Sequence, residues 1–160
     1  MQIFIGAIGR LKKGDELNLA NRFETRIKRS GANLGFTQFV HLDFDEDKNS
    51  QTEIRKTNEA KKLLASTPKN AFIIALDEHG RHFTSIEFSN KIKNYRDDGH
   101  PAIAFLLGGP DGHGQEVLNR ADLKLSLSKM TWPHQIARAL LLEQIYRAIT
   151  IMSNHPYHRE

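Results

Sequence analysis

Three segments of the chain carry residues that could bind a ligand. Each follows or ends an apolar run, and they read LDEHGRHF from Leu76, LGGPDGHG from Leu107 and SLSKMTWPH from Ser126. In an open parallel sheet, ligands bind beyond the carboxyl ends of the strands. The second segment is rich in glycine, which tolerates positive φ and lets a ligand approach the backbone. It predicts either a ligand-binding loop or a tight turn between strand and helix, and the glycines alone leave both open.

The C-terminal segment His155–Glu160 combines two histidines, a tyrosine and an arginine. Imidazole and guanidinium groups suit work on an anionic substrate or on one that loses a proton. This segment could therefore complete an active site. A polar chain end is usually frayed, however, and composition alone favours that alternative.

Basic residues gather at two further places. Arg22, Arg26 and Arg29 are spaced i, i+4 and i+7, so they share one face of a predicted helix. His134 and Arg138, spaced i and i+4, face one way from the start of the last predicted helix. For the three arginines an ordinary solvated face is the alternative. The net charge of +4 permits a nucleic-acid partner without requiring one.

The sequence excludes several kinds of site. It contains no cysteine, which rules out a disulfide, a thiolate metal site and a cysteine nucleophile. His79 and His82 lie near Asp77 and Glu78, but no further ligand set accompanies them, so we expect a solvated loop and no metal. The signatures of P-loop NTPases, dinucleotide sites and nucleophile elbows are missing.

No membrane segment or signal peptide is predicted. No apolar run approaches the roughly 18 residues of a membrane span. The N-terminal stretch MQIFIGAIGR has no basic residue before its apolar part, unlike a signal peptide. We therefore expect a cytoplasmic protein that does not associate with a membrane.

The elements that would position these segments alternate between strand and helix patterns. The runs AFIIAL and AIAFLL are continuously apolar, as a parallel strand covered on both faces requires. At about 150 residues per domain, residues 1–160 predict one α/β domain with a mostly parallel sheet. We predict strands at Gln2–Ile8, Thr37–Phe44, Ala71–Leu76, Ala102–Leu107 and Leu123–Leu127. We predict helices at Asp15–Arg29 and Thr52–Ala65, from a capping box at Thr84, and from about Pro133 to Met152.

Five short motifs together resemble a known family. They are LDEHG from Leu76, FLLGGPDG at Phe105–Gly112, LSKMTWPHQ at Leu127–Gln135, EQIYRA at Glu143–Ala148 and the terminal NHPYHRE. With the length and the order of elements, they closely resemble the bacterial ribosomal large-subunit methyltransferase H family over the whole chain.

The resemblance implies a fold and an activity that the residues alone do not suggest. The implied fold is the SPOUT α/β knot, a trefoil-knotted, mostly parallel sheet flanked by helices, in a homodimer. The implied reaction moves a methyl group from S-adenosylmethionine to ring nitrogen 3 of a pseudouridine in 23S rRNA, with the assembled ribosome as substrate. Knots are so rare that no pattern argument would have proposed one.

The resemblance also implies functional residues. The sulfonium of the cofactor makes the methyl group electrophilic, so the protein must align the nucleophile and help a weakly acidic imide lose its proton. By side-chain type, Tyr157 could stack on or hydrogen-bond the base, His158 could take the proton, and Arg159 could hold phosphate or the developing anion. The RNA-binding candidates are Arg22, Arg26, His134 and Arg138. The cofactor-binding candidates are Leu76, Gly108, Gly109, Leu127, Ser128, Lys129, Met130, Thr131 and Trp132.

The last predicted helix bears on assembly. Its apolar residues cover too much of the circumference for a helix with one exposed face, which predicts a homodimer. A helix buried within its own monomer is the alternative. These residues are Leu140, Leu141, Leu142, Ile145, Ile149, Ile151 and Met152.

Two other functions remain open. One is a non-catalytic ribosome-binding or assembly factor with the same fold, which would bind no S-adenosylmethionine. The other is a different nucleotide-dependent α/β enzyme, such as a small dehydrogenase. The missing dinucleotide fingerprint argues against the latter.

Overall fold

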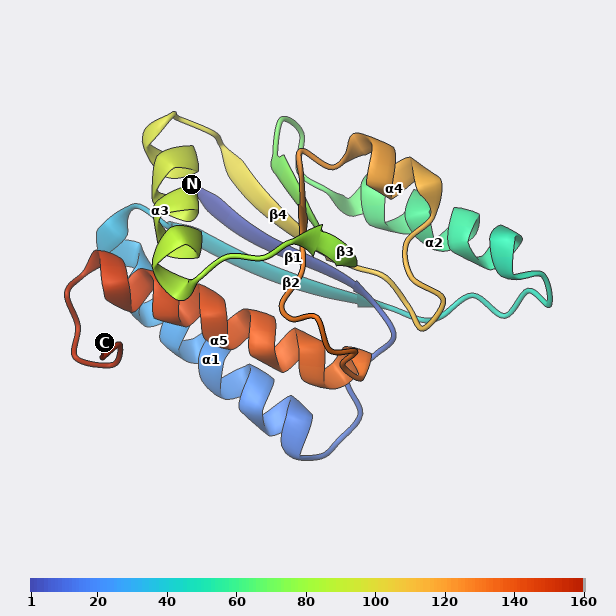
Figure 1. Ribbon diagram of the computed structural model, residues 1–160, viewed down its shortest axis with the longest axis horizontal. Coiled ribbons are helices and arrows are strands. Elements are labelled where there is room, and N and C mark those ends of the chain that lie inside the picture. The colour runs from blue at the N-terminus through green and yellow to red at the C-terminus, as the bar shows by residue number, and fades with distance from the viewer. Residues whose placement is uncertain (160) are drawn as a thin grey trace.

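A parallel five-stranded sheet forms the centre of the computed structural model, which describes residues 1–159 (Figure 1). The strand order is β2-β1-β4-β3-β5, and every neighbouring pair is parallel. This confirms the α/β class and the parallel sheet predicted from the sequence. The strands are β1 (Gln2–Ile8), β2 (Gln38–Phe44), β3 (Phe72–Arg81), β4 (Ala102–Leu107) and β5 (Leu123–Leu125).

Helices cover both faces of the sheet. One face carries α1 (Asp15–Gly31), α3 (Ser85–Asp97) and α5 (His134–Met152), and the other carries α2 (Thr52–Ser66) and α4 (Gln115–Arg120). A 3-10 turn at Ala32–Leu34 follows α1. Alternate residues of the strands face the two layers, so Ile103 and Phe105 of β4 pack towards α5, whereas Ala104 and Leu106 pack towards α2.

Most element boundaries agree with the predicted ones, and the exceptions have local causes. The capping box at the start of α3 is present, because Thr84 accepts from the Glu87 N–H and Glu87 accepts from the Thr84 N–H. The short helix α4 was not predicted, since six residues are too few to show a periodic pattern. Strand β5 ends at Leu125 and not at Leu127.

Helix α5 is enclosed by its own chain along most of its length. It packs between α1 and α3, and Leu141, Leu142, Ile145 and Ile149 are buried there. The burial of these four residues agrees with the alternative, a helix buried within its own monomer, and does not support a dimer. Leu140, a neighbour on the same helix, stays partly exposed.

Strand β3 continues five residues beyond the predicted Leu76, and the reason lies in β5. Leu125 pairs first with Leu76 and again with Arg81, because β3 bulges outward between these two residues. The Ser126 N–H donates to the Arg81 carbonyl at 2.9 Å. Within the bulge, Gly80 lies against the β5 backbone: a Cβ atom there would be 2.6 Å from the carbonyl carbon of Leu125. The 77–80 segment therefore closes tightly over the end of β5.

We expect Gly80→Ala to destabilise the protein by at least about 2 kcal/mol, because backbone atoms must move to admit the methyl group. Chemical denaturation followed by circular dichroism measures this. Gly14→Ala is the control, since a Cβ there would meet only the Glu16 side chain at 3.4 Å and the Lys12 carbonyl oxygen at 4.0 Å. Equal stability of the two variants would show that the bulge adapts without cost.

Candidate active site

A pocket of about 460 Å³ opens beyond the carboxyl ends of β3, β4 and β5. The three segments singled out in the sequence meet around it, and the first turns of α5 close one side. Its volume lies within the range of small-molecule sites. The structure thus brings eight of the nine predicted cofactor-binding residues to one cavity. Those eight are Leu76, Gly108, Gly109, Leu127, Ser128, Met130, Thr131 and Trp132. Lys129 belongs to the same loop but is exposed and does not line the pocket.

The glycine segment forms a tight turn at the edge of the pocket. The Gly112 N–H donates to the Gly109 carbonyl at 2.9 Å, with Pro110 in the second position and Gly112 at a φ of 80°. A Cβ atom on Gly108 would lie 2.8 Å from the carbonyl carbon of Gly112. Glycine at position 108 is therefore required by the turn itself. The tight-turn alternative is correct, and the turn lines a pocket as well.

Two buried side chains that the sequence analysis missed support this turn. Burial lowers the pKa of His113, and its Nε2 lies 3.1 Å from the Leu106 carbonyl, which the neutral ring can reach as a donor. Burial raises the pKa of Glu59, whose Oε1 accepts from the Asp47 N–H at 2.9 Å. The other oxygen of Glu59 would lie 3.2 Å from a Cβ atom on Gly109. The histidine was visible in GGPDGHG, whereas nothing in the pattern of α2 marked the glutamate.

The loop after β5 is held by its own serines. Ser126 donates to the Ser128 carbonyl at 2.8 Å, and the Ser128 hydroxyl accepts from the Met130 N–H at 2.9 Å. Two large apolar side chains remain exposed there: Met130 is 71% exposed and Trp132 41%. Such exposure at the rim of a pocket is typical of a surface that contacts a ligand or a partner.

Arg138 lies inside the protein, which contradicts its predicted contact with RNA phosphate. Its side chain is completely buried and donates to the Asp43 carboxylate at 2.6 Å and to the Gly9 carbonyl at 2.6 Å. The i, i+4 spacing did place His134 and Arg138 on one side of α5, and both line the pocket. That side faces the end of β1 and the pocket, so an inward-facing arginine was mistaken for a surface one.

A buried charge network extends from Arg138 to α1. Burial alone would raise the pKa of Asp43, but His41 and Arg138 beside it hold that pKa below its ordinary value. Burial alone would lower the pKa of His41, but Asp43 and Glu24 on either side raise it. The His41 ring lies between two carboxylates, with Nδ1 2.5 Å from Glu24 on α1 and Nε2 3.0 Å from Asp43 on β2.

This network predicts a pH-dependent contribution of His41 to stability. Because the folded-state pKa is raised, the contribution is complete below the ordinary value of 6.5 and is lost as the pH rises through the raised value. We expect the difference in unfolding free energy between the parent and His41→Gln to be largest just below pH 6.5 and to shrink above it. Urea denaturation from pH 5 to 9 measures the difference. A difference independent of pH would mean that the ring acts by packing alone.

The C-terminal segment is docked on the protein, contrary to the frayed-end alternative. The Tyr157 hydroxyl donates to Glu143 at 3.0 Å, and its ring meets Tyr146 edge-on at 4.8 Å between centroids. His158 is partly buried, with Nδ1 3.4 Å from an Arg147 nitrogen, and Arg159 is exposed. Glu160, the last residue of the predicted segment, lies outside the described residues.

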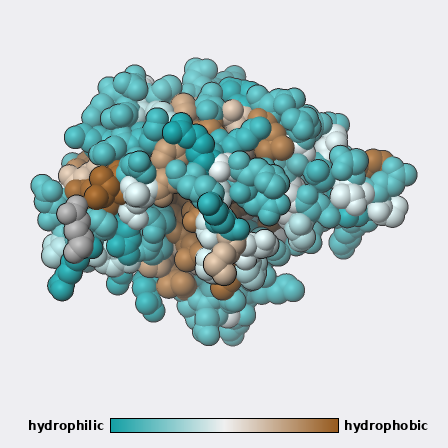
Figure 2. Space-filling view, viewed as in Figure 1, coloured by the Kyte–Doolittle hydropathy of each residue, from teal (hydrophilic) through white to brown (hydrophobic). Residues whose placement is uncertain are grey.

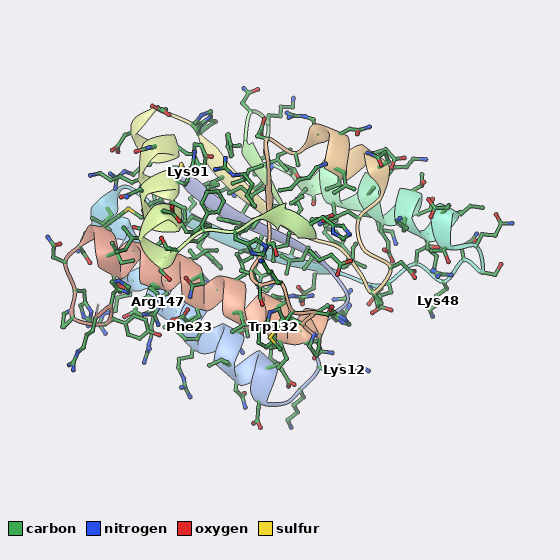
Figure 3. All side chains as sticks on the ribbon, in the orientation of Figure 1. Lys12, Phe23, Lys48, Lys91, Trp132 and Arg147 are labelled. Atoms are coloured by element: carbon green, nitrogen blue, oxygen red, sulfur yellow. The ribbon has the colours of Figure 1, made fainter. Side chains whose placement is uncertain are left out.

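This segment and the pocket lie on different parts of α5. Trp132, at the pocket, precedes the helix, whereas Arg147 belongs to its second half (Figure 3). Arg147 lies 13 residues after His134, about 20 Å at 1.5 Å per residue, but the segment turns back so that Tyr157 contacts Glu143, about 14 Å from His134. None of Tyr157, His158 and Arg159 lines the pocket of its own chain.

The basic face of α1 lies beside the docked C-terminal segment. Arg22 and Arg26 are both exposed, and the Arg26 guanidinium lies 5.5 Å from the centre of the Tyr146 ring. Because Tyr146 also contacts Tyr157, the structure brings one predicted RNA-binding residue next to the predicted catalytic residues. The two groups come from helices at opposite ends of the sequence.

Comparison with known proteins decides the family. A family model described as "Predicted SPOUT methyltransferase" matches residues 1–158. The chain is 43% identical over 159 residues to the ribosomal RNA large subunit methyltransferase H of Bartonella henselae, covering 99% of both chains. The corresponding proteins of Bartonella bacilliformis and Rhodopseudomonas palustris are 44% and 42% identical, with the same coverage.

The chain belongs to the SPOUT methyltransferase family. This confirms the resemblance predicted from the five motifs. The structure of a probable methylase family protein from Haemophilus influenzae shares the fold, with a TM-score of 0.55 at 13% identity, covering 99% of this chain and 70% of that one. SPOUT methyltransferases use S-adenosylmethionine, so the predicted cofactor is confirmed too.

Two further properties concern the described part of this SPOUT methyltransferase. Within residues 1–159, no helix is both long enough and apolar enough to cross a membrane. The same residues contain no cluster of three or more histidine and acidic side chains that could hold a metal ion.

Proposed function

We propose that this protein methylates ring nitrogen 3 of a pseudouridine in 23S rRNA, with the assembled ribosome in the cytoplasm as its substrate. The observation that carries the proposal is the convergence of three loops around one pocket, at the positions that match the family's cofactor contacts. The printed name of the relatives, which refers to the large ribosomal subunit, supports the rRNA substrate.

The pocket suits a nucleoside cofactor. Leu76, Leu107 and Leu125 supply apolar walls, and the glycine turn lets the main chain approach a ligand without intervening side chains. When bound, S-adenosylmethionine supplies an already activated methyl group. The residues at Gly108–Gly109 and Leu127–Trp132 would hold it and fix the direction of the methyl group. We propose that the chain from β5 onward passes through the closure at Gly80 and so forms the family's knot.

A homodimer would complete the site. Tyr157, His158 and Arg159 do not line the pocket of their own chain, and a second chain would bring its own C-terminal segment to that pocket. A second hollow of about 390 Å³ lies on the other side of the Trp132 loop. Phe83, Leu127 and Leu140 give it apolar walls, and hydrophobic side chains also appear over the middle of α1 and α5 in the space-filling view (Figure 2). This surface supports dimer contact better than the buried leucines of α5 do.

Within such a dimer, the chemistry divides between the two chains. One chain holds the methyl donor, and the other brings a histidine and an arginine to a nucleobase that must lose its imide proton. Arg26 lies beside the C-terminal segment, and Arg22 and Arg26, both exposed on α1, would contact phosphates of the rRNA. His134 lines the cofactor pocket. Because the methyl group is transferred there, we propose that His134 contacts the target nucleotide itself and not a distant phosphate.

Mass spectrometry of rRNA tests the proposed reaction. Ribosomes that lack the modification are incubated with the protein and methyl-labelled S-adenosylmethionine, and 23S rRNA is digested and sequenced. We expect one labelled methyl group on ring nitrogen 3 of a pseudouridine. Label at another nucleotide would overturn the assigned target. Calorimetry that detected no cofactor binding would instead favour the non-catalytic assembly factor.

A further inference from the structure

Two side chains from the middle and second half of α5 hold the C-terminal segment in place. Glu143 and Arg147 are one helical turn apart, and the Arg147 Nε donates to Glu143 Oε1 at 3.0 Å. The same oxygen accepts from the Tyr157 hydroxyl at 3.0 Å. The Arg147 guanidinium also lies 4.8 Å from the centre of the Tyr157 ring and 3.4 Å from His158 Nδ1. The motif EQIYRA thus supplies both partners of the docked segment.

These contacts fix the role of Tyr157. Its hydroxyl proton is directed at Glu143, one ring face is next to Arg147, and its edge meets Tyr146. Burial and the hydrogen bond to Glu143 raise the pKa of Tyr157, so the phenol stays protonated at neutral pH. A side chain held on these sides is suited to anchoring the segment. Of the residues that follow it, Arg159 is exposed, whereas His158 packs beside Arg147 with its Nε2 buried.

The path of the chain makes such an anchor necessary. After α5 the backbone turns at Asn154, where φ is 53°, and the His155 N–H donates to the Thr150 carbonyl at 2.9 Å. Tyr157 is thereby brought back alongside the helix. Without a contact at Tyr157, the two residues beyond it would sample many directions, and each encounter with substrate would require ordering them.

We infer that Glu143 and Arg147 are positioning residues for methyl transfer: by anchoring Tyr157, they set the direction in which His158 and Arg159 leave α5. This inference rests on the proposed role of the C-terminal segment in the partner's site. A surface ion pair alone contributes little to stability, and this pair is partly exposed, with side chains 16% and 26% accessible. Its main effect is therefore expected on the rate of methylation.

Single-turnover methylation of ribosomes at saturating S-adenosylmethionine tests the inference. We expect Glu143→Ala and Tyr157→Phe each to lower the rate by about 10-fold or more, with an unchanged cofactor dissociation constant. Because the two residues act as one unit, the double variant should be little slower than either single variant. Glu143→Gln keeps an acceptor for the Tyr157 hydroxyl and should recover much of the rate. Asp45→Ala removes the exposed partner of Arg10, away from the pocket and the C-terminal segment, and should leave the rate unchanged.

The outcomes separate this inference from the proposed function. If removal of Tyr157–Glu160 slows methylation but Glu143→Ala and Tyr157→Phe do not, the anchor is wrong and the role of the segment stands. If removal of the segment has no effect, the proposed role itself fails. If the two rate losses multiply in the Glu143→Ala, Tyr157→Phe double variant and its melting temperature falls, Glu143 acts on stability and not on the position of the segment. Should Glu143→Ala fail to fold, Tyr157→Phe and Glu143→Gln still decide between these results.

Discussion

An enzyme that lacks Tyr157–Glu160 will methylate ribosomes at least about 10²-fold more slowly than the parent, the low end for a lost acid–base group. It will bind S-adenosylmethionine equally well. The reason is geometric, because Tyr157, His158 and Arg159 do not line the pocket of their own chain. Single-turnover methylation, calorimetry with the cofactor and sedimentation measure rate, binding and assembly separately. An unchanged rate would return the segment to a structural role and direct attention to His134.

Mixing two inactive variants distinguishes a shared site from a local effect. Gly108→Ala displaces the glycine turn and so damages the cofactor pocket, while its C-terminal segment stays intact. The truncated chain has the opposite defect. If sites form across a dimer, random reassociation of the two should restore about a quarter of the parental activity, because half of the dimers then carry one complete site. Each variant alone should stay inactive. No recovery from exchanged dimers would contradict the shared site.

Replacement of Arg138 by methionine will destabilise the fold by about 3–5 kcal/mol, the usual result of removing one partner of a buried ion pair. The change leaves the partly buried Asp43 without its nearest cation and frees the Gly9 carbonyl, which accepts at 2.6 Å. Urea denaturation at pH 7 gives the magnitude. Since Arg138 also lines the pocket, we expect weaker cofactor binding in whatever fraction remains folded.

Two companion variants show whether the lost charge pair is responsible. Arg138→Met combined with Asp43→Asn should recover part of the loss, because the second change removes the unpaired carboxylate. Arg10→Met removes a partner of Asp45 at the surface, where the Arg10 side chain is 63% accessible, and should change stability little. A double variant less stable than Arg138→Met would mean that the Asp43 charge contributes mainly through His41.

The sequence predicted the sheet better than it predicted the ends of the strands. Continuous apolar runs mark buried parallel strands whatever surrounds them, so Ala102–Leu107 was placed without error. The extension of β3 to Arg81 depends on a second pairing with Leu125, more than 40 residues away, which no local pattern records. The predicted strand residues Ser126 and Leu127 lie in a loop: the Ser126 N–H still donates to Arg81 of β3, but the Ser126 hydroxyl donates to the Ser128 carbonyl and turns the chain away from the strand.

The sequence predicted the part of the candidate site that the main chain forms. It predicted the side-chain contacts of the site less well. Loops at the carboxyl ends of neighbouring parallel strands must meet, so the position of the pocket followed from the topology. The spacing of residues on a helix predicts which of them share a face, but not whether another element packs against that face. For this reason Arg138 was expected on the surface. The contact of Tyr157 with Glu143 joins residues 14 positions apart through a reversal of the chain, and residue type alone does not predict such a reversal.

The double pairing of Leu125 with Leu76 and Arg81 also constrains the order of folding. The segment that contains Leu125 must reach its place beside Leu76 before the bulge at 77–80 can settle over it. The link from Arg138 to Gly9 then joins residues 129 positions apart. Contacts so distant in sequence must overcome a large loss of chain entropy before they stabilise anything, which slows folding. We therefore expect this small protein to refold slowly, with the region around the pocket acquiring protection from hydrogen exchange after the rest of the sheet.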